Sequence, residues 1–147
     1  MDIAPTTVSS ATEVPAHNQS ATPADLQIRP RNRNFASAVI ERRRWVGGDP
    51  YASAFFNALS VTFPEGEIFF IESLKKFRKR VPAKLQREIR AFIQQEAIHS
   101  REHHSFNEHL KDCDFEIGRL EDAICRVVNG IRKRSEYDQL VATMCIE

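Results

Sequence analysis

The chain has 147 residues, which is enough for one domain of ordinary size. Lysine and arginine number 21 against 20 aspartates and glutamates, so the overall charge favours no particular partner. The three cysteines lack C-x-x-C spacing, which argues against a disulfide framework. There is no signal-peptide pattern and no apolar run of the ~20 residues that span a bilayer. We therefore expect a cytoplasmic protein without a transmembrane segment.

The first 34 residues differ in composition from the rest of the chain. They are rich in alanine, threonine, serine and proline, and they contain few large apolar side chains. Such a segment buries too little surface to offset its ordering entropy. The sequence therefore predicts a disordered N-terminal arm at residues 1–34 and one folded domain at residues 35–147.

Helix signals begin at a turn of glycines that ends in Asp49 and Pro50. Asp49 is a predicted N-cap and Pro50 a predicted first helical residue. Apolar residues then recur every three or four positions as far as Val81, and we expect Pro64 and Gly66 to kink or restart this helix near residue 63.

Three further helices are predicted. The second covers residues 82–111, the third covers about 116–130, and the fourth begins near Ser135. The predicted apolar faces of the last two contain Leu120, Ile124, Val127 and Ile131, then Tyr137, Leu140 and Met144. With no credible strand, the sequence predicts an all-α helical bundle.

Ionisable residues interrupt the apolar faces of these helices. In the second helix the face runs through Leu85, Ile89, Phe92, Glu96, His99, His103, Phe106 and Leu110. In the first helix Glu67 occupies such a position between Phe63 and Phe70, and in the fourth Glu147 follows Met144. A spacing of three and four residues places each set on one side of its helix.

These residue types suit a metal ion. A buried carboxylate is costly unless it is paired or bound to a cation, and a Glu-x-x-His pair facing a bundle interior is typical of iron and manganese sites. We predict that Glu67, Glu96, His99, His103 and Glu147 bind a divalent metal, with iron first and manganese or zinc as alternatives. The alternative without a metal is a buried ion pair between Glu96 and His99.

Three stretches resemble a bacterial family known as predicted metal-dependent hydrolases: residues 44–50, 59–70 and 92–107. The resemblance covers roughly residues 40–147. It implies a ferritin-like fold of the di-metal carboxylate type and hydrolysis of a small-molecule substrate. Within it, Glu67, Glu96, His99 and His103 match the family's presumed metal positions, and Glu147 matches the start of a later helix.

Members of that family extend beyond the position of Glu147. From this we expect an incomplete, truncated bundle, which a homodimer would complete. The alternatives are a di-iron oxidase or oxygenase, since the same ligands suit both, and an inactive truncated paralogue.

Two basic segments raise a further alternative, a binding module for an anionic surface. Residues 29–44 carry six arginines, and residues 75–90 carry eight lysines and arginines. We interpret both as a solvated tail and a solvated helix face, and we expect no nucleic-acid partner, because no base-reading motif accompanies them.

Overall fold

The protein is described here from a computed structural model, which covers residues 29–35 and 43–147. These residues form four α-helices, α1 (Pro50–Phe77), α2 (Ala83–Asp112), α3 (Gly118–Arg132) and α4 (Glu136–Ile146), and one 3-10 turn, η1 (Arg78–Arg80). No strand occurs in these residues, so the all-α prediction is confirmed. None of their helices is long and apolar enough to cross a membrane. The ferritin-like character stays a prediction.

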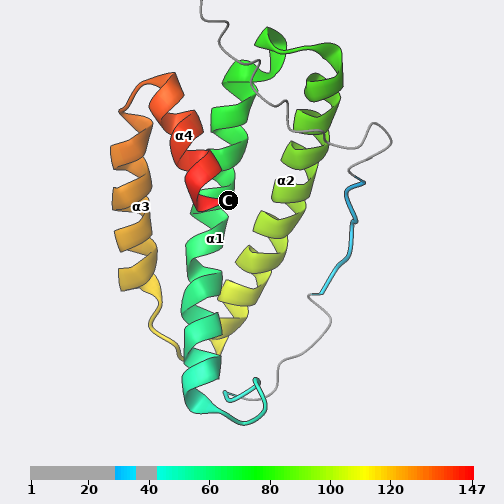
Figure 1. Ribbon diagram of the computed structural model, residues 1–147. Helices are drawn as coiled ribbons and strands as arrows, with labels where there is room; N and C mark the ends of the chain where they lie inside the picture. The colour runs from blue at the N-terminus through cyan, green and yellow to red at the C-terminus, as the bar shows by residue number, and fades with distance from the viewer. Residues whose placement is uncertain (1–28, 36–42) are drawn as a thin grey trace, which may run out of the picture.

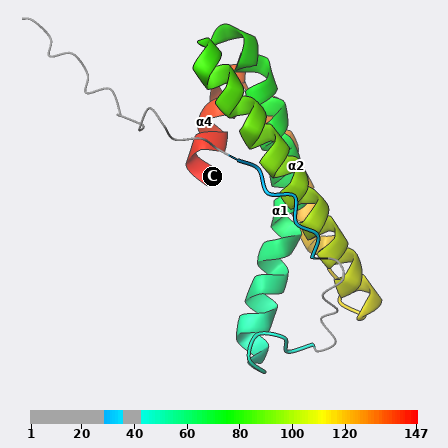
Figure 2. The same cartoon turned by 90° about the vertical axis from the view of Figure 1, so that its right-hand side faces the viewer.

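The central element of the bundle is α1. It packs against α2 on one side and against α3 and α4 on the other (Figure 1). The end of α2 reaches α3 through an ion pair between Lys111 and Glu121 at 3.1 Å. Viewed from the side, α1 and α2 diverge toward the start of α1 (Figure 2). Phe69 and Phe70 of α1 and Val128 of α3 form the buried apolar core, which Phe92 of α2 also contacts.

The start of α1 follows its sequence signals. The Asp49 side chain accepts hydrogen bonds from the backbone N–H groups of Tyr51 and Ala52 at 2.8 and 3.1 Å, and Pro50 is the first helical residue. Gly47 and Gly48 precede it with φ of 57° and 83°, values that residues with a Cβ rarely adopt. The predicted N-cap is therefore confirmed.

Of the kink or restart predicted near residue 63, the restart is wrong, because α1 runs unbroken through Pro64, and the kink stays a prediction. Proline has no N–H for the carbonyl four residues earlier, which here belongs to Ser60. Asn107 of α2 supplies the missing donor, since its Nδ2 lies 3.2 Å from the Ser60 carbonyl oxygen. Both residues are buried, so this side chain satisfies a carbonyl that water cannot reach.

On α3 and α4 the buried residues differ from the predicted ones, and on α4 the buried residues are polar. On α4, Tyr137 and Met144 are exposed, while Gln139 and Thr143 are buried. Gln139 Nε2 donates to the carbonyls of Arg132 and Arg134, both at 2.9 Å, which holds α4 to the preceding turn. On α3, Val128 is buried and the predicted Val127 is exposed.

Residues 29–35 have no regular secondary structure and run beside α2 (Figures 1 and 2). The Arg101 guanidinium donates to Asn32 Oδ1 and to the Arg33 carbonyl, and the Phe35 N–H donates to Glu102 at 2.6 Å. The rest of the predicted arm, residues 1–28, lies outside the described residues, as do residues 36–42. The domain boundary at residue 35 stays a prediction.

The Pro64–Asn107 compensation predicts non-additive stability effects. Asn107→Ala should lower the free energy of unfolding by about 1–3 kcal/mol, because it leaves the buried Ser60 carbonyl without a donor. In a Pro64→Ala background the loss should be smaller, because the introduced alanine restores the helical N–H. Urea unfolding of the two single variants and the double variant measures the coupling, and additive losses would contradict the compensation.

Candidate metal centre

Two carboxylates and one imidazole meet where α1 packs against α2. Glu67 lies on α1 close after Pro64, and Glu96 and His99 lie three residues apart on α2. Glu67 and Glu96 are 3% and 2% exposed, whereas half of the His99 side chain is accessible. The three residues therefore combine a buried acidic floor with a more open imidazole.

The ligand atoms of these three residues form a compact group. One carboxylate oxygen of Glu67, one of Glu96 and one ring nitrogen of His99 all lie within 4.8 Å of one another. His99 Nδ1 lies 3.9 Å from Glu67 Oε1 and 3.9 Å from Glu96 Oε1. These separations exceed hydrogen-bonding distance, so the imidazole does not by itself satisfy either carboxylate.

Two buried carboxylate oxygens of this group have no hydrogen-bond partner in the described residues, and for this reason the group suits a cation. Glu67 Oε2 and Glu96 Oε1 are buried and accept no hydrogen bond in the described part of the chain. A buried acceptor without a donor is costly, and a buried charged one more so. A metal ion supplies what both oxygens lack, and oxygen and imidazole nitrogen are ligands that iron, manganese and zinc accept.

The electrostatics agree with this unsatisfied state. Burial, followed by the charges of Glu96 and Glu147, raises the pKa of Glu67 to about 8. Burial and then the charge of Glu147 raise the pKa of Glu96 to about 7. Without a cation, the two carboxyl groups therefore hold protons at a pH where exposed glutamates are ionised.

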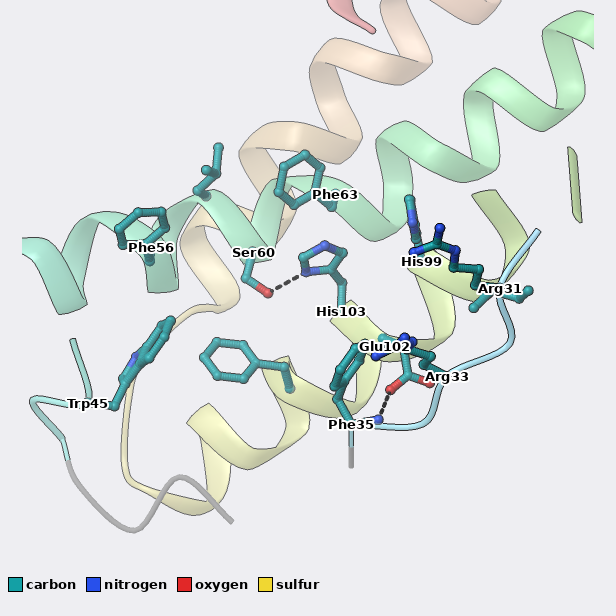
Figure 3. A pocket seen from close by; sticks show the side chains of 13 residues that line it. Arg31, Arg33, Phe35, Trp45, Phe56, Ser60, Phe63, His99, Glu102 and His103 are labelled. Atoms are coloured by element: carbon teal, nitrogen blue, oxygen red, sulfur yellow. Dashed lines mark hydrogen bonds between the residues drawn. The ribbon is translucent and has the colours of Figure 1, made fainter. Parts of the chain in front are cut away.

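His103 lies one turn beyond His99 but outside the group of three ligand atoms. Its Nδ1 is 2.9 Å from Ser60 Oγ, which also lies 2.9 Å from Asn107 Oδ1 (Figure 3). Because Asn107 Nδ2 donates to the Ser60 carbonyl, its Oδ1 accepts the hydroxyl proton. Ser60 Oγ must then accept from His103 Nδ1–H, which leaves the lone pair of His103 on Nε2.

The environment of the His103 ring also favours its neutral form. The ring packs on Phe63, with centroids 4.5 Å apart. Burial and then the nearby charge of His99 lower its pKa, and the charge of Glu102 offsets this only in part. His103 therefore presents a neutral ring whose Nε2 can accept a metal ion or a proton.

Glu147 lies on the wall of the cavity that contains the three ligands. The cavity has a volume of about 620 Å³ and is bounded by α1, α2, α3 and the end of α4. Glu147 is exposed, and its carboxylate is outside the compact group, although its charge acts on both buried glutamates. The fold thus brings all five predicted residues to one cavity and three of them into ligating proximity; metal binding itself stays a prediction.

Ser60 and Asn107 are the residues near the centre that sequence reasoning missed. Both are polar and buried, and both fall off the apolar faces. The available signal was Pro64, whose missing N–H requires a polar donor near residue 60. That reasoning predicts a donor without saying which residue of another helix provides it.

Comparison with known proteins adds a family to this geometry. A family model described as predicted metal-dependent hydrolase matches residues 29–147. The chain belongs to this family. As a member of the predicted metal-dependent hydrolases, it contains the Glu67, Glu96 and His99 group within the matched region. No curated protein and no solved structure matches the chain.

The raised pKa values predict how the stability of the metal-free protein depends on pH. The folded chain holds protons that the unfolded chain releases, so stability should fall as the pH rises from about 4.5 toward the folded pKa values of about 7 and about 8. Glu67→Gln replaces one of the two buried carboxyl groups by a neutral amide, so it removes part of this loss of stability at high pH. In EDTA-treated protein, we expect Glu67→Gln to raise the melting temperature on the order of 5 °C at pH 8.5 and to change it little at pH 5.

Thermal unfolding followed by circular dichroism measures both values. Glu88→Gln, at a partly exposed position of α2, serves as the control and should behave like the parent protein at both pH values. An equal shift for Glu67→Gln at pH 5 and pH 8.5 would contradict the assigned ionisation.

Proposed function

We propose that the protein is a metal-dependent hydrolase in which Glu67, Glu96 and His99 bind a divalent metal. His103 and Glu147 are the proposed additional ligands from the wall of the same cavity. Iron is the proposed metal, with manganese and zinc as alternatives of the same ligand preference. Membership in the predicted metal-dependent hydrolases supports the reaction class.

One observation carries the proposal. Two glutamates from different helices face each other in the α1–α2 contact, and each has a buried oxygen without a hydrogen-bond partner in the described residues. No lysine or arginine of that part of the chain forms an ion pair with either one, and the His99 imidazole lies 3.9 Å from an oxygen of each. A cation between them explains an arrangement that is otherwise costly.

In this function the residues have separate roles. When bound, the metal would supply a water molecule of lowered pKa for attack on the substrate. Glu67 and Glu96 would hold the positive charge from the buried side, and the accessible side of His99 leaves that face open to a substrate. His103, if it is not itself a ligand, would accept a proton at Nε2, because Ser60 occupies Nδ1.

The alternative is a di-iron oxidase or oxygenase. Glu147 favours it, since a third carboxylate on the same cavity adds negative charge that could balance a second cation. Iron-loaded protein distinguishes the two reactions. Its optical spectrum and oxygen consumption report an oxidase or oxygenase, whereas release of product from p-nitrophenyl esters reports a hydrolase.

Metal analysis tests the site directly. Protein purified from iron- and zinc-replete medium should contain at least one equivalent of transition metal. Glu67→Gln, Glu96→Gln and His99→Ala should each weaken metal affinity by about tenfold or more, because each removes a ligand. Plasma mass spectrometry after dialysis against graded chelator gives the affinities.

Glu88→Gln is the matched control, since it removes a carboxylate from α2 outside the cavity. Its metal content should equal that of the parent protein. Metal-free parent protein that also fails to bind added Fe²⁺, Mn²⁺ or Zn²⁺ would contradict the proposal and favour the inactive paralogue.

The proposed assembly is a homodimer through the face formed by α3 and α4, and the proposed location is the cytoplasm. The side of the bundle formed by α3 and α4 exposes apolar residues, and α2 does not cover it. These exposed residues are Val127, Val141, Met144 and Ile146. Light scattering during gel filtration measures the mass, and a monomer at micromolar concentration would contradict the dimer.

A further inference from the structure

A second cavity lies on the other side of His99 and His103. Its volume is about 530 Å³, within the 300–1,000 Å³ of typical small-molecule sites. The two cavities share Leu59, Phe63, His99 and His103 as lining residues. These four side chains therefore form a wall with the candidate metal centre on one face and the second cavity on the other.

Aromatic rings make up most of the apolar lining of the second cavity. They come from the segment before α1, from α1 and from α2, and they are Phe35, Trp45, Phe56, Phe63 and Phe106 (Figure 3). Trp45 contacts Phe56 and Phe106, with centroid separations of 6.1 and 5.7 Å. Its Nε1 donates to Asn57 Oδ1 at 2.8 Å, which fixes the ring against the cavity. The apolar part of the site is therefore preformed.

Positive charge lies at one edge of this apolar space. Arg31 and Arg33 line the cavity, and Arg31 extends from residues 29–35 toward His99 (Figure 3). Within the described residues, neither guanidinium makes a hydrogen bond or an ion pair. Two unpaired guanidiniums beside an apolar cavity fit the head group of an amphipathic anion.

Glu102 also lines the cavity, but its charge is already compensated. Its carboxylate accepts from the Phe35 N–H at 2.6 Å and from the Arg101 guanidinium at 2.7 Å. Since Arg101 balances Glu102, the charges of Arg31 and Arg33 remain available.

We propose that the second cavity binds a carboxylic acid with an unbranched or aromatic apolar body. The carboxylate contacts Arg31 and Arg33, and the apolar body lies among the rings of Trp45, Phe56 and Phe106. As a binding site, this assignment is independent of the metal. As a site for the reaction, in which the acid would be the product that hydrolysis of its ester or amide releases, it rests on the proposed function, because only the metal would give the wall residue His99 a role.

The chain contains one tryptophan, and it lies in this cavity. Tryptophan fluorescence therefore reports on the site without added label. Titration of the EDTA-treated protein with decanoate should give a saturable change in Trp45 emission with a Kd of about 100 µM or tighter. Decanol should bind more weakly, because it has the apolar chain without the charge.

Arg31→Gln/Arg33→Gln should weaken decanoate binding by about tenfold or more and leave decanol binding unchanged, because it removes only the charge-assisted contacts. Arg87→Gln/Arg90→Gln is the matched control, since it removes two exposed arginines of α2 outside the cavity. Ile98→Phe, which fills the cavity from α2, should weaken binding of both ligands while the circular dichroism spectrum stays helical.

Three outcomes would overturn the assignment: no saturable change up to 1 mM decanoate, equal affinities of the Arg31→Gln/Arg33→Gln variant and the parent, or an equal loss in the Arg87→Gln/Arg90→Gln control. Because the titration uses metal-free protein, its result does not depend on the metal. Decanoate binding by a protein that never binds metal would support the acid site and contradict the proposed hydrolase. Metal binding without decanoate binding would contradict the acid site and support the proposed hydrolase.

Discussion

The structure depends on a pair of acids placed where two helices touch. Glu67 and Glu96 are nearly inaccessible to water, and burial together with the charge of Glu147 raises the pKa of both. A protein that needed only a stable α1–α2 contact would be better served by leucine at both positions, because leucine brings no desolvation penalty. A cation bound between the two carboxylates would offset this desolvation cost, so the pair is best explained as a binding site for positive charge.

Around this pair, hydrogen bonds between polar side chains fix the structure. Pro64 removes a backbone donor from α1, and Asn107 replaces it from α2. The same amide accepts a hydrogen bond from the Ser60 hydroxyl, and that hydroxyl in turn fixes the His103 ring. A break in the helical ladder is thereby linked, through three side chains, to the orientation of an imidazole beside the acids. Ser60 and Asn107 therefore hold the His103 ring in place, although neither belongs to the group of ligand atoms.

Sequence reasoning predicted the helices and the three residues that lie close together, Glu67, Glu96 and His99, because both leave local signals in the sequence. Asp49 and Pro50 mark the start of α1, and the three-residue spacing of Glu96 and His99 depends only on the geometry of one helix. It failed where a contact depends on another helix. Gln139 and Thr143 are buried because they hydrogen-bond at the α3–α4 turn and along α4, and no periodicity of apolar residues indicates that. Phe56 matched the apolar spacing, yet it is 44% exposed and lines a cavity.

The attachment of α4 places an exposed carboxylate on the same cavity as two buried ones. Gln139, near the start of the helix, is hydrogen-bonded to Lys76 and to the carbonyls of the preceding turn, while Met144 and Ile146, near its other end, are exposed. Glu147 lies about 12 Å along the helix axis from Gln139. The two acids of the α1–α2 contact are buried, whereas Glu147 is exposed. The cavity therefore presents buried carboxylates on one wall and a hydrated carboxylate on another.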